Sequence, residues 1–171
     1  DPLSDAALRQ PHGIAEQYRP NLAALSGRSL TSDTHSGFTT CQAEIDGLTL
    51  RVAIDPADHT IQGMSAEGAT GEVTKRLLAV LADLCHGLPI LEAADHGALK
   101  LEYKLRRSGS RPRPGIVIAE CTDPAFSFIS ALLRAILADY RRQTGFKDIR
   151  NNFDVAAGPR WMNANEAGRK A

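Results

Sequence analysis

The clearest alternation of hydrophobic and polar positions lies between residues 38 and 65, where three short runs are separated by two turns. Asp46-Gly47 lies between the first two runs, and this dipeptide is typical of a two-residue hairpin turn. The segment 55–58 contains Pro56 and forms the second turn. The hydrophobic positions of the middle run, which would share one face, are Leu48, Leu50, Val52 and Ile54. The pattern predicts a three-stranded antiparallel meander over residues 38–65.

A first amphipathic helix is predicted directly after the meander. Thr70 is its expected N-cap, Glu72 lies in the first turn, and Gly87 is the expected C-terminal glycine. Helical spacing is kept by hydrophobic residues at Val73, Leu77, Val80, Leu81 and Leu84. A core-facing helix over residues 71–86 follows from this spacing.

The strongest helix signal starts at Asp123-Pro124. Asp123 is a favourable N-cap and Pro124 suits the first helical position, while Gly145 ends the pattern. The expected buried stripe is Phe126, Ile129, Leu132, Leu133, Ile136 and Tyr140. Residues 123–145 are therefore predicted to form a long helix packed on the core.

Between these helices the pattern changes. Residues 88–94 suit a short helix or turn, and residues 99–105 alternate hydrophobic and charged side chains like a half-buried strand. An exposed loop over 106–114 and a short hydrophobic strand over 115–119 would follow. The expected fold is thus α+β: an antiparallel sheet of about five strands with two main helices packed on one face. Residues 1–36 are predicted as an N-terminal arm and linker, 37–145 as the α+β core domain, and 146–171 as an irregular C-terminal arm.

Charge narrows the classes of partner. The 20 acidic and 20 basic side chains cancel, so the chain as a whole has no basic field that would attract nucleic acid. No hydrophobic run is long enough to span a membrane, so no membrane partner is expected. The loop over 106–114 is the local exception, with Arg106, Arg107, Arg111 and Arg113. These arginines form either a solvated loop or a contact for an acidic or phosphate-rich partner.

The three cysteines, Cys41, Cys85 and Cys121, are odd in number and contain no CxxC pair. This spacing disfavours a disulfide framework and a zinc finger, and it favours the cytoplasm as the compartment. The histidines likewise form no metal motif. Each cysteine is either a small buried hydrophobic residue or, for Cys41 and Cys121, part of a shared pocket. Cys121 would lie at the N-terminus of the last helix, where the helix dipole lowers a thiol pKa.

The element order and several short phrases resemble the NifU/IscU-type scaffolds of iron–sulfur cluster assembly. In that family a cysteine opens the hairpin, a Gly-Cys-Gly turn follows the third strand, and a last cysteine precedes the final helix. Cys41 and Cys121 match the first and last of these cysteines. The phrase from Ile61 to Gly71 looks like the third strand with its turn, and residues 87–93 (GLPILEA) look like the segment after the helix.

The resemblance implies a metal or cluster site with an incomplete ligand set. The middle cysteine is replaced by Ala69 or its neighbour, so two thiols remain where a [2Fe–2S] cluster takes four ligands. The candidate metal ligands are Cys41, Glu120, Cys121 and Asp123, and the candidate binding residues are Glu67 with the four arginines. The candidate cofactor is an iron–sulfur cluster or a single divalent metal.

Three function classes remain open. The leading one is a divergent scaffold or accessory protein that acts by binding a metal or a protein partner. An enzyme would instead use a pocket of Cys41, Glu67, Glu120, Cys121 and Asp123 on small molecules or metals. A protein-interaction module would use the arginine-rich loop and the two terminal arms.

Overall fold

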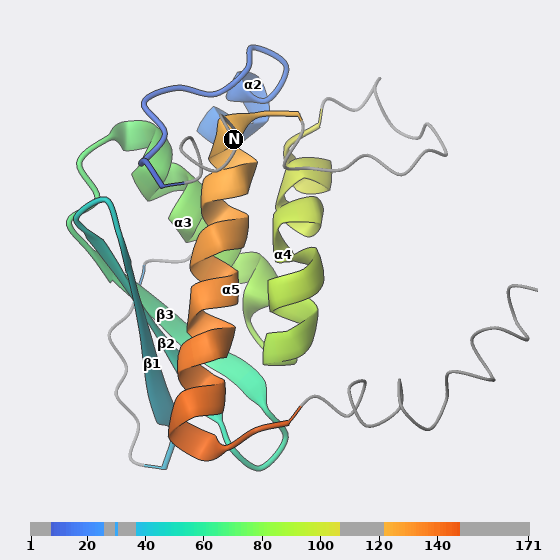
Figure 1. The fold of residues 1–171 in the computed structure, drawn as a ribbon. Helices are drawn as coiled ribbons and strands as arrows, with labels where there is room; N and C mark the ends of the chain where they lie inside the picture. The colour runs from blue at the N-terminus through green and yellow to red at the C-terminus, as the bar shows by residue number, and fades with distance from the viewer. Residues whose placement is uncertain (1–7, 26–29, 31–36, 107–121, 148–171) are drawn as a thin grey trace, which may run out of the picture.

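The computed structural model describes residues 8–25, 30, 37–106 and 122–147 (Figure 1), and every structural statement below concerns these residues. In chain order the elements are α2 (Arg19–Ala24), β1 (Thr39–Ile45), β2 (Leu48–Asp55), β3 (Thr60–Glu67), α3 (Glu72–Cys85), α4 (Ile90–Leu105) and α5 (Pro124–Thr144). The α+β class is therefore confirmed.

The predicted meander is confirmed as a three-stranded antiparallel sheet in the order β1-β2-β3. Asp46 and Gly47 have φ values of 52° and 74°, which is the left-handed backbone that a tight two-residue hairpin requires. The turn sets the register, in which Ile45 pairs with Leu48 and Cys41 with Val52. Because side chains alternate along a strand, all the large hydrophobic residues of β2 reach the same face.

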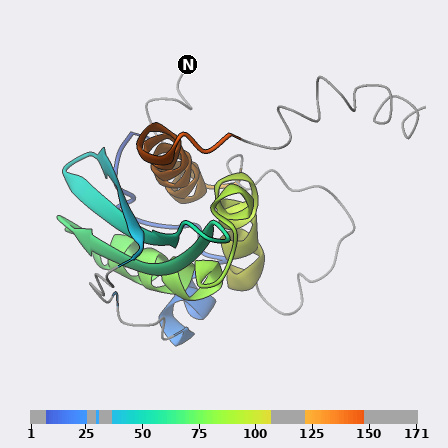
Figure 2. The same ribbon diagram turned by 90° about the horizontal axis from the view of Figure 1, so that it is seen from below.

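The buried face of the sheet is covered by helices. In β2, the residues Leu48, Leu50, Val52 and Ile54 are fully buried. α5 lies along β1, α3 contacts β3, and α4 packs against α3 and α5 on the side away from the sheet (Figure 2). The sheet therefore meets two of the long helices directly, and the third one completes the core.

Capping of α5 follows the sequence prediction. The Asp123 side chain accepts a hydrogen bond from Ala125 N, Pro124 occupies the first turn, and Gly145 ends the helix at φ 69°. All six residues of the predicted stripe are fully buried. For α3 the prediction was wrong in one detail, since Gly71 and not Thr70 is the N-cap and no side chain caps the helix.

The predicted strand over residues 99–105 is wrong, because these residues are the second half of α4. Along this helix the inward positions include Gly97 and Glu102, and Leu99 and Tyr103 point outward with 37% and 48% exposure. Because Leu101 and Leu105 are buried whereas Leu99 and Tyr103 are exposed, hydrophobic residues occur on both faces of the helix, and they happen to fall at every second position. The same helix includes most of residues 88–94, which were predicted as a separate short helix or turn.

Three strands are present among the described residues, so the count of about five is not borne out there. Two further strands were predicted. Residues 99–105 belong to α4 instead, and residues 115–119 lie outside the described residues. Some backbone groups on the free edge of β3 find hydrogen-bond partners in the segment that leads into α4. Ile61 N donates to Leu88 O at 2.8 Å, and Ile90 N donates to His59 O at 2.8 Å.

Residues 8–25, part of the predicted N-terminal arm, pack on the body of the domain; we call this segment the strap. Its buried hydrophobic residues are Ile14, Tyr18 and Leu22, the last of which lies in α2. The Tyr18 ring meets the Phe126 ring edge-on at a centroid distance of 5.1 Å. The strap crosses the end of the molecule at which α3 and α5 begin (Figure 1).

Candidate functional site

Three connections meet at the end of the molecule that the strap crosses: the β1–β2 turn, the β3–α3 connection and the N-terminus of α5. Gly68 lies so close to the β1–β2 turn that a Cβ on it would collide with the carbonyl oxygen of Gly47. At φ 79°, Gly68 also has a backbone conformation that glycine adopts without strain. These glycines bring the β3–α3 connection, which includes Ala69, against the hairpin turn.

Gln10 of the strap fastens these two connections together. Its Nε2 donates to the carbonyl oxygens of Asp46 and Gly68, each at 3.0 Å, and its Oε1 accepts from Thr70 N at 3.3 Å. The backbone N–H of Gln10 also donates to Asp46 Oδ2 at 2.8 Å. Gln10 is only 5% exposed, and these bonds satisfy its own buried amide group.

Asp123 fastens the strap to α5. Its Oδ1 accepts from Ala125 N at 2.8 Å, and its Oδ2 accepts from Ala15 N, also at 2.8 Å. The side chain was predicted as a metal ligand, but both of its oxygens accept backbone hydrogen bonds and the residue is 9% exposed. Its structural role is to cap α5 and to anchor the strap.

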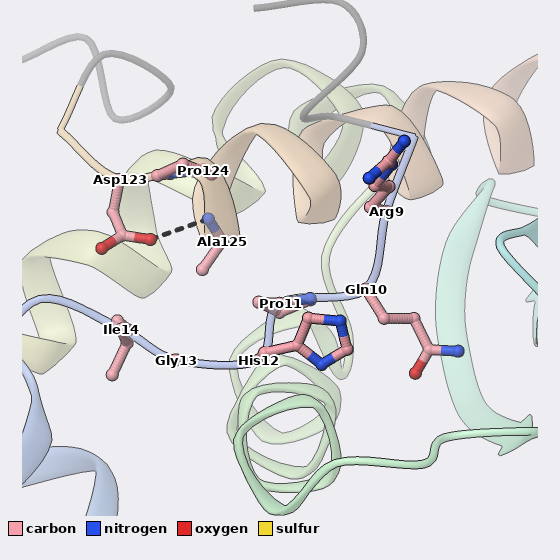
Figure 3. A pocket seen from close by; sticks show the side chains of 9 residues that line it. All are labelled: Arg9, Gln10, Pro11, His12, Gly13, Ile14, Asp123, Pro124 and Ala125. Carbon is pink, nitrogen blue, oxygen red and sulfur yellow. Dashed lines mark hydrogen bonds between the residues drawn. The ribbon is translucent and has the colours of Figure 1, made fainter.

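Two hollows flank the strap. The larger, of about 440 Å³, lies between residues 9–14 of the strap and Asp123, Pro124 and Ala125 at the start of α5 (Figure 3). The smaller, of about 220 Å³, lies between the strap and the first turns of α3, where Glu72, Val73 and Arg76 line it. Residues 12–14 line both hollows, so the strap separates the start of α3 from the start of α5.

Cys41 lies near the other end of α5. It is fully buried on β1, and Gln143 Nε2 lies 3.9 Å from Cys41 Sγ. Burial raises the pKa of the Cys41 thiol to about 12; the negative charge of Asp139 adds to the increase, and Arg142 opposes it. Cys41 is therefore a buried neutral thiol at neutral pH, which is a poor metal ligand and a poor nucleophile.

The structure does not bring Cys41 and Asp123 together. Gln143 contacts Cys41, and the start of α5 at Asp123 lies more than five helical turns away along the axis, which is roughly 30 Å. Glu120 and Cys121 are outside the described residues. Of the four predicted metal ligands, Cys41 thus belongs to one end of α5 and Asp123 to the other.

Cys85 and Glu67 have ordinary structural surroundings. Burial raises the pKa of the Cys85 thiol to about 12, while Lys100 opposes this shift. Glu67 ends β3 and pairs with Arg51 at 3.0 Å, and this hydrogen-bonded partner lowers the pKa of the Glu67 carboxyl. Both residues therefore have partners or packing that account for them.

Arg106 was predicted to belong to an exposed loop, and this is wrong. Its side chain is only 13% exposed, and its Nε donates to both carboxylate oxygens of Glu102 at 2.8 and 2.9 Å. Tyr18 OH donates to the same carboxylate at 2.9 Å. Arg106 therefore neutralises a buried glutamate that holds the strap. The other three arginines, Arg107, Arg111 and Arg113, lie outside the described residues.

Two sets of contacts had no signal in the sequence. One is the strap network of Gln10, Ala15 and Tyr18, whose partners are distant in the chain. The other is the pair His59–Tyr140, in which His59 Nδ1 lies 2.7 Å from Tyr140 OH beside the Phe146 ring. Within the described part of the chain, no three His, Cys, Asp or Glu residues are grouped so that they could hold a metal ion.

Comparison with known proteins adds no family assignment: no protein-family model matches the chain, and no curated protein is significantly similar to it. Among the described helices, none combines the length and hydrophobicity needed to cross a membrane.

Proposed function

We propose that this protein is a divergent NifU/IscU-type scaffold or accessory protein that acts by binding rather than by catalysis. The proposal is supported by one observation above all: the β3–α3 connection with Ala69 and the start of α5 lie at the same end of the molecule. Gln10 binds the first and Ala15 binds the second, and five residues of chain span at most about 18 Å. In the resemblance, these two places correspond to the middle and last cluster ligands.

The donor set of this end does not fit a four-ligand cluster. Ala69 has no ligand atom, and both oxygens of Asp123 accept hydrogen bonds from backbone N–H groups. Cys41 is buried near the other end of α5. Cys121 and Glu120 remain the predicted ligands, and one thiolate with one carboxylate suits a single divalent metal better than a [2Fe–2S] cluster.

The enzyme alternative has less support. It requires Cys41 to share a pocket with Cys121, two residues before Asp123, and to act as a thiolate. Its complete burial and its raised pKa argue against both requirements. For the interaction-module alternative, Arg106 is engaged by Glu102 and is not available to a partner. A protein partner remains part of the proposal through the scaffold role itself.

The test is anaerobic addition of Fe²⁺, with and without sulfide, to the full chain, followed by absorption spectra and elemental analysis. We expect one bound Fe²⁺ and no stable cluster absorption with sulfide. Cys121→Ala should abolish binding, whereas the matched variant Cys85→Ala, which removes a buried thiol from α3, should retain it. A stable cluster would show that an intact ligand set exists after all. Absence of bound iron in the wild-type protein would reject the metal-binding role.

A further inference from the structure

The hairpin turn between β1 and β2 contains the only Asp-Gly dipeptide of the chain, Asp46-Gly47, and both residues are exposed. Asp46 has φ 52°, a left-handed backbone conformation that costs a non-glycine residue free energy. Its chain neighbours aside, no described atom lies within 4 Å of the position that a Cβ on Gly47 would take. The turn is therefore strained at its aspartate and uncrowded at its glycine.

Two groups of this turn are close in the covalent chain, and the strap holds one of them. Asp46 Oδ2 accepts from Gln10 N at 2.8 Å, and Asp46 O accepts from Gln10 Nε2 at 3.0 Å. The Gly47 N–H donates to no group in the described part of the chain. Asp46 Cγ and Gly47 N are the ends of a stretch of five bonded atoms, so a bond between them closes a five-membered ring.

We propose that Asp46-Gly47 is a site of spontaneous covalent modification, the conversion of Asp46 to isoaspartate, and that the strap slows this reaction. Gly47 N forms a bond to Asp46 Cγ, and one carboxyl oxygen leaves as water with the amide proton and a proton from solvent. The product is a succinimide ring, to which water then adds, returning the solvent proton. Addition at Cγ restores aspartate. Addition at the backbone carbonyl carbon breaks its bond to Gly47 N, so that the chain then runs through the Asp46 side chain.

The reaction needs no oxidant, reductant or cofactor, and it leaves the composition of the protein unchanged. Its barrier depends on conformation, since the Asp46 side chain and backbone must rotate to bring Cγ onto Gly47 N. The two hydrogen bonds from Gln10 oppose this rotation because they hold both the carboxylate and the backbone carbonyl of Asp46. Contacts of the strap thus set the rate at which the turn reacts.

A second turn of the sheet provides a comparison within the same molecule. Asp58-His59 is also a turn aspartate followed by a residue of positive φ, 62° at His59. Here the nitrogen is engaged, because His59 N donates to Asp55 O at 2.8 Å. The carboxylate is engaged as well, because Asp58 Oδ1 accepts from Thr60 N at 3.0 Å. With a side chain on the second residue and both groups bonded, this turn is not expected to react.

Isoaspartate changes the end of the molecule that the strap crosses. It lengthens the turn by one methylene group, and a two-residue hairpin cannot keep its geometry with that insertion. The backbone oxygen of Asp46, to which Gln10 Nε2 donates, becomes part of a free carboxylate on a displaced chain. The Gly47 carbonyl against which Gly68 packs is displaced too. The modification therefore loosens the strap at Gln10, and it does not rest on the proposed function.

Incubation of the folded full chain at neutral pH and body temperature tests the proposal. Peptide mapping by mass spectrometry and isoaspartyl-specific enzymatic methylation locate the product. We expect isoaspartate to accumulate at Asp46 and not at Asp58. Gln10→Ala should accelerate the conversion about fivefold, as expected for the loss of one net hydrogen bond to the turn. Gln17→Ala, at an exposed position of the strap, is the matched control and should react at the wild-type rate.

A further variant tests ring closure without altering the strap. Asp46→Asn suits the left-handed turn and reaches the same succinimide by losing ammonia, so it should deamidate in the folded protein. Retention of its amide would show that the turn forbids ring closure. Absence of isoaspartate from wild-type and Gln10→Ala proteins, while a synthetic peptide of residues 43–50 converts, would overturn the proposal. Equal conversion at Asp58 would do the same, and equal rates in wild-type and Gln10→Ala proteins would overturn the role of the strap.

Discussion

At the scale of single residues, the proposed binding end, where the β3–α3 connection and the start of α5 lie, is organised by side chains that satisfy backbone groups. The side chains of Gln10 and Asp123 together form hydrogen bonds with five backbone groups, and these partners are as far as 108 residues away in the chain. A buried N–H or C=O that loses its partner costs free energy, so each of these side chains stabilises the fold beyond its own packing. This accounts for Asp123 without any metal.

Substitution of Asp123 tests this double role. Asp123→Ala should lower the free energy of unfolding by about 2 kcal/mol, because it removes a helix cap and a hydrogen bond to the strap. Asp123→Asn keeps one acceptor oxygen and should lose about half as much. Urea denaturation monitored by circular dichroism measures both. Glu44→Gln, which also removes one carboxylate charge but from an exposed position of β1, should stay within about 0.5 kcal/mol of the wild type. A fully stable Asp123→Asn protein would contradict the anchoring role.

At the scale of elements, α4 shows where patterning misleads. The buried carboxylate of Glu102 forms an ion pair with Arg106 and accepts a hydrogen bond from Tyr18 OH, and no pattern within residues 99–105 indicates these partners. Leu99 and Tyr103 are exposed, and exposed hydrophobic residues are common on folded proteins. Hydrophobic residues thus lie on both faces of the helix, with Leu101 and Leu105 buried beside Glu102 and with Leu99 and Tyr103 outside, so residues 99–105 acquire a strand-like alternation although the chain is helical.

Substitutions of Leu99 and Leu101 distinguish a helical from a strand assignment of residues 99–105. On a strand, Leu99 and Leu101 would share one face and cost alike when shortened. On α4 they differ, since Leu101 is fully buried and Leu99 is 37% exposed. Leu101→Ala should therefore lower the free energy of unfolding by about 2–5 kcal/mol, and Leu99→Ala by less than about 0.5 kcal/mol. Thermal and urea unfolding of the two variants measure the difference, and similar losses would refute the helical assignment.

The other elements were predictable because their signals are local. Asp46-Gly47 determines a hairpin by backbone geometry, and Asp123-Pro124 with Gly145 delimits α5 by capping. The binding end was only partly predictable. The resemblance indicated the β3–α3 connection and the start of α5. The strap that joins them depends on Gln10 and Ala15, which have no distinctive local pattern. Contacts across more than a hundred residues depend on tertiary packing that the sequence pattern does not encode.

At the scale of the whole molecule, α5 connects two chemically different ends. Its start lies against the strap, lines the larger hollow and adjoins the candidate binding site. Its last turns lie against Cys41, where Asp139 Oδ2 accepts from Gln42 N at 2.7 Å on the edge strand β1. A single continuous core joins these ends, and both Cys41 and Cys85 belong to it as neutral thiols. The stability of the molecule should therefore depend on pH through these thiols.

The sign of this dependence follows from the raised pKa values. Burial raises the pKa of both the Cys41 and Cys85 thiols to about 12, compared with about 8.5 in an unfolded chain. Their contribution is fully present below about pH 8.5 and is lost as the pH rises toward 12, because the unfolded chain releases these protons first. The free energy of unfolding should fall by about 1–2 kcal/mol per thiol between pH 8 and pH 10.

Urea denaturation from pH 7 to pH 10 under reducing conditions measures the slope. The double variant Cys41→Ala/Cys85→Ala should start from a lower stability, since it loses packed side chains, but it should show a clearly shallower fall with pH. Val80→Ala is the matched control because it shortens a buried side chain of α3 that does not titrate, so its slope should equal that of the wild type. If the double variant kept the wild-type slope, the two thiols would not be the titrating groups. The measurements stop at pH 10 because burial also raises the pKa values of Tyr18 and Tyr140. Ionisation of these tyrosines at higher pH would lower the free energy of unfolding further.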